Sequence, residues 1–170
     1  MIADAVSEAA GGSVERVRQA LAGFGLKAEI KHFDASTRTS ADAAAAIGCT
    51  VEQIAKSVIF RAVKSDQAVL VMASGSNRVD TAKITAALGE EIGKADAEFV
   101  RKRTGFAIGG VAPVGHSEPC KVLIDRDLEA FSEIWAAAGS PHAVFRLTPA
   151  ELQQITEGQV LDIKVGDIKA

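Results

Sequence analysis

Tyrosine is absent from this chain of 170 residues, and tryptophan occurs only once. Proteins that bind single-stranded nucleic acid without sequence preference stack its bases on several aromatic rings, so the shortage of rings argues against that class. Long hydrophobic runs are also missing, since none approaches the roughly 20 apolar residues that a membrane-spanning helix needs. We therefore expect neither a membrane nor DNA as a partner.

Cysteine and histidine are scarce and scattered. Cys49 and Cys120 lie in different contexts, and the first residues lack the basic segment and apolar core of a signal peptide. We therefore expect a cytoplasmic protein with reduced thiols. His32, His116 and His142 show no metal-ligand spacing, so the sequence predicts no metal and no cofactor. No serine stands in a Gly-x-Ser-x-Gly elbow, which argues against Ser-His-Asp catalysis.

Charge is unevenly distributed, although the net charge is only −3. Residues 1–53 have a balance of −2 and residues 104–170 a balance of −4, whereas residues 54–103 have +3 and end in an Arg-Lys-Arg triplet. A local basic face on an acidic protein can meet phosphates transiently without general affinity for nucleic acid. The alternative is a solvated helix end, where cations offset the helix dipole.

The most unusual stretch is residues 105–116, where four glycines and one proline are interleaved with apolar residues. A flexible linker would instead be polar and rich in serine. We interpret the stretch as a loop whose backbone N–H groups point into a pocket, because glycine permits close approach to the backbone. A strand with a bulge and a tight turn is the alternative.

Capping residues and apolar periodicity predict helices and strands in mixed order. Helices are expected at 14–24 after a Ser13 cap, from Ser40 to Gly48, from the Thr50–Gln53 capping box to about Lys56, from Asp80 to about Gly89, from Asp96 to Gly105, after Asp127 with Leu128, Phe131, Ile134 and Trp135 facing inward, and after the Thr148–Glu151 capping box. Strands are expected at 28–33, 57–63, 67–73, 121–125 and 142–147, with the second and third forming a hairpin. Because no strict βαβ repeat appears, the pattern favours one domain with a mixed sheet and helices around it.

Six segments together resemble one protein family. They are the alanine-rich segment 39–48, 54–60 with Ile-Ala-Lys-Ser, 75–80 with Gly-Ser-Asn-Arg, the glycine-rich 104–115, 139–142 and 147–152. Their order and spacing resemble the YbaK/ProRS-associated editing domains, deacylases of mischarged tRNA that occur free-standing or inserted in prolyl-tRNA synthetase. The resemblance covers about residues 14–163 of a single domain that we expect to span 1–170.

The resemblance implies a compact α/β domain around a mixed, partly barrel-like sheet. It also implies a hydrolase acting in trans on tRNA that carries a small wrong amino acid, with tRNA for proline as one candidate. Because the sequence shows no metal-ligand spacing, we expect this hydrolase to be metal-independent. Mischarged tRNA and prolyl-tRNA synthetase are the implied partners. Two alternatives are a tRNA-binding or synthetase-docking module without hydrolysis, and a domain that binds a small ligand. The amino acid, the subfamily and the oligomeric state do not follow from the sequence.

The family pattern assigns roles to particular residues. Lys56 matches the pocket lysine of the family, and Gly109 to Pro113 match its Gly-x-x-x-Pro loop. An aminoacyl ester is already activated toward water, so the enzyme mainly orients it and stabilises the oxyanion. The expected catalytic residues are Lys56, Gly109 and Gly110; the expected substrate-binding residues are Val111, Ala112, Pro113, His142, Arg78 and Asp80; and the expected tRNA-binding residues are Arg101, Lys102 and Arg103.

Simpler interpretations of these residues remain open. Lys56 can be a helix-end lysine and Asp80 a helix cap, while Arg78 can be an exposed loop arginine and His142 a structural histidine. Ser57 departs from the family pattern, in which some members carry an asparagine directly after the lysine.

Overall fold

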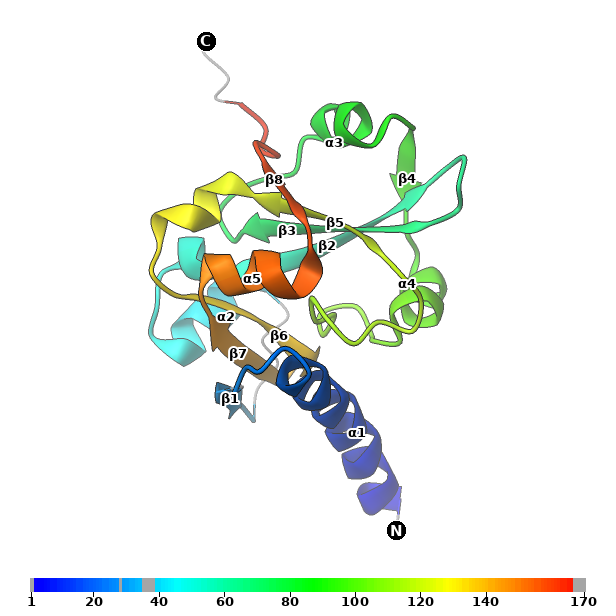
Figure 1. Cartoon of the computed structure of the whole chain (residues 1–170). Helices are drawn as coiled ribbons and strands as arrows, with labels where there is room; N and C mark the ends of the chain where they lie inside the picture. The colour runs from blue at the N-terminus through cyan, green and yellow to red at the C-terminus, as the bar shows by residue number, and fades with distance from the viewer. Residues whose placement is uncertain (1, 28, 35–38, 167–170) are drawn as a thin grey trace.

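The computed structural model describes residues 2–27, 29–34 and 39–166, and its strands form two sheets (Figure 1). The first sheet has the order β1-β7-β6, in which β1 is Glu29–His32, β7 is Ala143–Leu147 and β6 is Ile134–Ser140. Both strand pairs are antiparallel. The strands predicted at 28–33 and 142–147 are therefore present as β1 and β7.

The second sheet is mixed and has the order β4-β2-β3-β5-β8. Its antiparallel part contains β2 (Ala55–Ala62), β3 (Ala68–Ser74) and β4 (Ile92–Lys94), while β5 (Lys121–Asp125) lies parallel to both β3 and β8 (Gln159–Leu161). The predicted hairpin and the strand at 121–125 are confirmed. So is the expected mixed α/β fold, although the strands divide between two sheets and close no barrel among the described residues.

The two sheets meet where β2 begins. A parallel bridge joins Ile54, the residue before β2, to Trp135 in β6. Both side chains are buried, and Val144 of β7 and Ala43 belong to the same apolar cluster. This junction brings β2 of one sheet against β6 of the other and prepares the position of the site.

Helices surround the sheets (Figure 1). They are α1 (Ile2–Ala22), α2 (Ser40–Ile47), the 3₁₀ turn η1 (Val51–Gln53), α3 (Thr81–Leu88), α4 (Ala97–Thr104), the 3₁₀ turn η2 (Arg126–Ala130) and α5 (Pro149–Thr156). Asp80 and Asp96 cap α3 and α4 as predicted, and both predicted capping boxes are present. Within the described ranges, no helix is both long and apolar enough to span a bilayer.

The first helix differs from its prediction at both ends. It begins at Ile2, so Ser13 lies inside α1 instead of capping it. Val14, Val17 and Leu21 are buried as expected, but Phe24 lies beyond the helix and is 43% exposed. Phe24 does not continue the buried stripe, because the helix ends at Ala22 and helical periodicity ends with it.

The helix predicted after Asp127 is wrong. A 3₁₀ turn occupies Arg126–Ala130, and Ile134–Ser140 forms the strand β6 instead. Ile134 and Trp135 are buried, as the helix prediction expected. Burial is not confined to one side of the segment, however, because six of the seven residues of β6 are buried. A strand covered on both faces has no alternating pattern, so its sequence is easily taken for a buried helix.

Two local predictions need smaller corrections. The helix expected from Thr50 to Lys56 ends at Gln53, because Ile54 already has extended backbone and Lys56 is the second residue of β2. The N-cap of α2 is Thr39, whose side chain accepts from the amide of Asp42 at 3.0 Å, so Ser40 is the first helical residue. Residues 105–120 contain no helix or strand, which confirms the loop interpretation of the glycine-rich stretch.

Candidate active site

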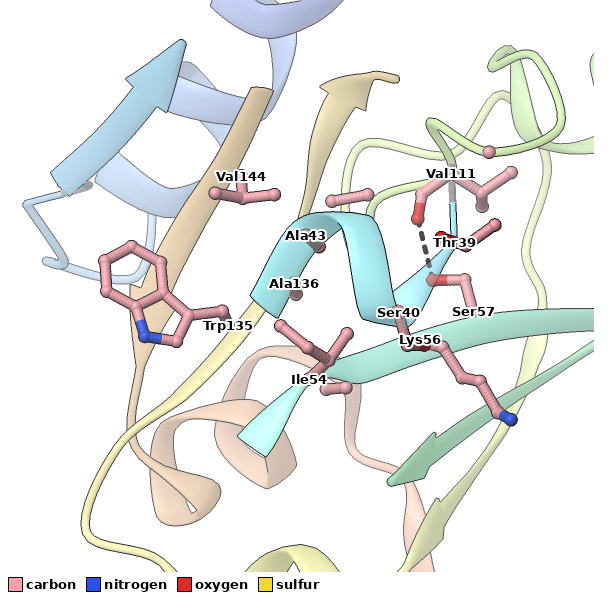
Figure 2. Close-up of a pocket in the computed structure, with 13 residues that line it drawn as sticks. Thr39, Ser40, Ala43, Ile54, Lys56, Ser57, Val111, Trp135, Ala136 and Val144 are labelled. Atoms are coloured by element: carbon pink, nitrogen blue, oxygen red, sulfur yellow. Dashed lines mark hydrogen bonds between the residues drawn. The ribbon is translucent and has the colours of Figure 1, made fainter. Parts of the chain in front are cut away.

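A small cavity of about 70 Å³ lies at the junction of the two sheets (Figure 2). It is bounded by the start of β2, by β6 and β7, by the N-terminal end of α2 and by the glycine-rich loop, residues 105–116. Its lining residues are Thr39, Ser40, Ala43, Ile54, Ala55, Lys56, Ser57, Gly109, Val111, Trp135, Ala136, Ala137 and Val144. The fold thus brings together Lys56, Gly109 and Val111, which the sequence singled out from two distant segments.

A larger hollow of about 570 Å³ lies elsewhere, between the end of α1, β7 and the start of α5. None of the predicted site residues lines it. Its arginine, Arg146, forms ion pairs with Glu29 at 2.7 Å and Glu133 at 3.1 Å. Volume alone therefore does not select the site, and the small cavity is the stronger candidate because of the groups around it.

Lys56 supplies the cation of the small cavity. Its ammonium Nζ donates to the carbonyl of Gly75 at 3.3 Å, and partial burial lowers the pKa of the amine from its ordinary value, while the charge of Asp125 opposes that shift. Figure 2 shows the side chain extending away from Val111. Because successive side chains of a strand point to opposite faces, the neighbouring Ser57 faces the loop instead.

The turn that receives Lys56 is anchored by a buried carboxylate. Asp125 is 1% exposed, and its oxygens accept from the backbone amides of Ser74 at 3.0 Å and Asp127 at 2.9 Å and from the side chain of Asn77 at 2.8 Å. These bonds hold the turn that contains Gly75.

Within the described ranges, no group of three or more His, Cys, Asp or Glu side chains is arranged to hold a metal ion.

Two residues of the glycine-rich loop line the cavity, Gly109 and Val111, and among the described residues neither amide is committed to another group. The N–H of Gly110 donates to the carbonyl of Ala107 at 2.9 Å, whereas in the described part of the chain the N–H groups of Gly109 and Val111 donate to no protein acceptor. Gly109 has a φ of 90°, which favours glycine. Free backbone donors of this kind are what an oxyanion requires. Gly109 and Val111 are therefore the candidate donors of the loop, whereas the amide of Gly110, which the sequence also suggested, is already bonded within it.

Gly110 is a glycine for a different reason. An added Cβ would lie 2.9 Å from two backbone atoms of Ser140 and 3.0 Å from the nitrogen of Pro141. The loop thus packs its backbone against the end of β6, and Gly110 does not line the cavity.

The second half of the predicted loop motif lies behind the cavity. Ala112 is fully buried in the main core, and its carbonyl is 2.7 Å from Nε2 of His116. Pro113 is buried and borders a separate surface hollow together with His116. Neither Ala112 nor Pro113 lines the cavity.

Three other predicted substrate-binding residues are not brought to the cavity. Asp80 accepts from the amide of Ala82 at 3.0 Å as the cap of α3, and Arg78 is exposed beside it. His142 is exposed, and its backbone amide donates to Ser140 Oγ at 3.1 Å. Asp80 is thus the helix cap of its simpler interpretation and Arg78 the exposed arginine, while the roles predicted for the three residues in substrate binding stay predictions.

The basic triplet on α4 is not uniform. Arg101 and Lys102 are exposed, but Arg103 pairs with Asp66 at 2.7 Å and Glu118 at 3.3 Å. Its guanidinium also lies 5.2 Å from the ring centre of Phe99. Only the first two cations are presented to solvent.

Several lining residues were not predicted from the sequence. Ser57 was noted only as a departure from the family, although its hydroxyl donates to the Val111 carbonyl at 2.7 Å. Trp135 and Ala136 were placed in or beside a helix, because β6 lacks alternation. Thr39 and Ala43 lie in the alanine-rich segment 39–48 but were given no role, Val144 carries no local signal, and the three come together only when the two sheets meet.

Comparison with known proteins identifies the family of this chain. The aminoacyl-tRNA editing domain model matches residues 34–155. The uncharacterized protein YwhH of Bacillus subtilis (strain 168) is 31% identical over 148 residues, which cover 87% of this chain and 94% of that protein. A proline–tRNA ligase of Limosilactobacillus fermentum is 31% identical over 111 residues, which are 62% of this chain but only 19% of the ligase.

Solved structures point in the same direction. A crystal structure described as a candidate trans-editing enzyme for prolyl-tRNA synthetase is 46% identical, with a TM-score of 0.85, and the match covers 91% of this chain and 98% of that one. The hypothetical protein APE2540 is 26% identical with a TM-score of 0.81, covering 88% and 99%. By sequence and by structure, the chain belongs to the aminoacyl-tRNA editing domain family.

Proposed function

We propose that this protein is an aminoacyl-tRNA deacylase that acts in trans and hydrolyses the ester of a small wrong amino acid on tRNA. The observation that carries the proposal is the cavity of about 70 Å³ at the sheet junction, which Lys56, Gly109 and Val111 line together. Membership of the editing family and the trans-editing relative support it.

The cavity suits a side chain of few heavy atoms. Its apolar lining comes from Ala43, Ile54, Trp135, Ala136 and Val144, and hydroxyl groups come from Thr39, Ser40 and Ser57. Because Trp135 and Ile54 are held by the junction of the sheets, the space cannot widen easily around a larger acyl group. Size would then discriminate between amino acids, as it does in any close-packed pocket.

The chemical step requires orientation more than a strong nucleophile. With the acyl group in the cavity, the amides of Gly109 and Val111 stabilise negative charge on the ester oxygen. The ammonium of Lys56 adds positive charge near the ester or the terminal phosphate. Water then attacks the carbonyl carbon, the ester C–O bond breaks, and the tRNA hydroxyl leaves with a proton. No metal ion or other cofactor is part of this proposal.

The direct test is single-turnover deacylation across a panel of tRNAs charged with alanine, serine, cysteine, threonine and proline, including tRNA for proline. We expect release of one or more small amino acids and no release of proline from its own tRNA. The same assay after exhaustive chelation should give the same rate. Loss of activity with chelator and its return with zinc would contradict the metal-free mechanism.

A non-hydrolytic module that binds tRNA or docks on prolyl-tRNA synthetase is the second candidate, favoured by the match to part of a proline–tRNA ligase. Tight binding of charged tRNA without turnover of any panel member would select it. A cytoplasmic location and association with the synthetase accompany both proposals.

A further inference from the structure

We infer that Ser57 and His116 are a pair of positioning residues, which hold two consecutive carbonyls of the glycine-rich loop and thereby aim the free amide of Val111 into the cavity. The inference rests on the proposed function for its effect on catalysis. Its structural part, the restraint of the loop, can be measured without any substrate.

Ser57 holds the loop from the side of β2. Its hydroxyl donates to the carbonyl of Val111 at 2.7 Å, a contact that Figure 2 draws between the strand and the loop. Ser57 follows Lys56 directly, so adjacent residues of one strand serve opposite faces. The same segment of β2 therefore carries the cation and fixes the loop that carries the amides.

His116 holds the next carbonyl. Its Nε2 is 2.7 Å from the oxygen of Ala112, and because a carbonyl only accepts, Nε2 must carry the proton. The ring meets Phe106 edge to face with centroids 6.2 Å apart, and Arg16 lies 4.4 Å over the other ring and donates to Gly105 O at 2.9 Å. Phe106, which the histidine contacts, is thus itself held in place from α1.

These contacts bracket the amide of Val111. A peptide unit is planar, so a hydrogen bond to its N–H or to its carbonyl oxygen restrains the orientation of the whole unit. The bond from Gly110 N–H to Ala107 fixes the unit on one side of the Val111 amide, and Ser57 fixes the unit on the other side. His116 then fixes the following unit. Glycine at 109 and 110 would otherwise leave this backbone free to rotate.

The test compares matched variants. Ser57→Ala and His116→Leu each remove a donor, whereas Ser57→Thr keeps the hydroxyl and His116→Gln keeps a side-chain N–H of similar reach. Ser132→Ala is the control, since Ser132 is exposed and lies outside the small cavity. Hydrogen exchange of residues 105–116 should be at least threefold faster in both donor-free variants, and close to wild type in Ser57→Thr, His116→Gln and the control.

Catalysis provides the second measurement. A loop displaced by about 1 Å can cost about 100-fold in rate, so we expect Ser57→Ala and His116→Leu to lower the single-turnover rate constant about 10- to 100-fold, with tRNA affinity within twofold of wild type. The double variant should be no more than about twofold slower than the slower single variant, because both act on one loop.

Several results would overturn the inference. Unchanged exchange of the loop in folded Ser57→Ala and His116→Leu proteins overturns it whatever the activity. Weaker tRNA binding at an unchanged rate constant also overturns it, as does a double variant whose rate shows the product of the two single effects. If the wild-type protein hydrolyses no substrate, the proposed function fails, and the exchange measurement alone decides whether the two residues restrain the loop.

Discussion

At the residue scale, two effects act on the pKa of Lys56 in opposite directions. Partial burial lowers the pKa, and the nearby negative charge of Asp125 raises it by a smaller amount. Its ammonium has a carbonyl acceptor at 3.3 Å, a weak bond that a substrate phosphate or ester oxygen can replace. The residue is therefore suited to a ligand that carries negative charge.

We expect Lys56→Ala to lower the single-turnover deacylation rate about 30- to 1000-fold, equivalent to about 2–4 kcal/mol of transition-state stabilisation. Folding should be retained, since the side chain is only half-buried. Lys56→Arg should restore little, because a planar guanidinium replaces a compact ammonium. Lys64→Ala, at the exposed hairpin turn, is the control. Wild-type rates in folded Lys56→Ala would falsify the catalytic role.

Gly110 leads to a different expectation from the one based on sequence. From the sequence alone, Gly110→Val should damage activity more than folding. The backbone of Ser140 and Pro141 lies within 3.0 Å of any added Cβ, so we now expect Gly110→Ala to cost about 1–3 kcal/mol of unfolding free energy.

Denaturant unfolding measures this cost. Gly12→Ala is the matched control, because an added Cβ there meets no atom within 4 Å and the residue lies inside α1, where alanine should stabilise by up to about 1 kcal/mol. Equal stability of Gly110→Ala and wild type would show that the loop does not pack on the end of β6.

At the scale of elements, the three basic side chains in the last turn of α4 differ in whether they are paired or exposed to solvent. Arg103 is committed to Asp66, Glu118 and Phe99, whereas Arg101 and Lys102 are exposed in the last turn. Phosphate contacts release counterions, so their number is visible in the salt dependence of binding. Of the three residues expected from the sequence to bind tRNA, Arg101 and Lys102 are therefore the stronger candidates for contacts with its phosphates.

Replacing Arg101 and Lys102 together by alanine should make the slope of log binding constant against log salt shallower by about one to two units. Arg103→Ala should leave the slope unchanged and lower the melting temperature instead. Titrations of tRNA at four or more salt concentrations distinguish the two effects. An unchanged slope in the double variant would mean that the exposed cations are a helix-end cluster only.

Elements also show how far sequence patterns reach. The caps of α3, α4 and α5 and the β2–β3 hairpin were predictable, because a cap or a tight turn involves residues only a few positions apart. The strand β6 was not, because its burial on both faces removes the alternation that identifies a strand.

At the scale of the whole molecule, Arg16 of α1 contacts the glycine-rich loop at Phe106 and Gly105, beside the half-buried His116. Burial lowers the pKa of His116 from the ordinary 6.5, the bond to the Ala112 carbonyl opposes that shift, and the charge of Arg16 adds to it. The unfolded chain, lacking this burial, binds the proton at higher pH. Between the two pKa values the unfolded state therefore holds more protons than the folded state.

The contribution of His116 to stability should therefore be fully present above pH 6.5 and lost as pH falls through its lowered folded-state value. We expect the free energy of unfolding to decline less steeply below pH 6.5 in His116→Gln than in wild type. Urea unfolding at a series of pH values measures the difference. Parallel curves for the two proteins would show that His116 does not titrate with folding.

The sequence by itself determined the local structure: where most helices begin, the β2–β3 hairpin, the loop at 105–116 and the family to which the chain belongs. It also placed Lys56 and Gly109 in one site through the order of its motifs. These features depend on neighbouring residues, or on patterns that survive along the chain.

Only the tertiary structure decided which groups of the site are available. The Ser57 hydroxyl and the Val111 carbonyl are 54 residues apart in sequence, and Trp135 reaches the cavity from a strand that no local pattern revealed. Whether an amide is free, or a glycine is required by a neighbouring strand, depends on where distant backbone lies. That placement results from burying the apolar faces of two sheets against each other, a property of the whole chain.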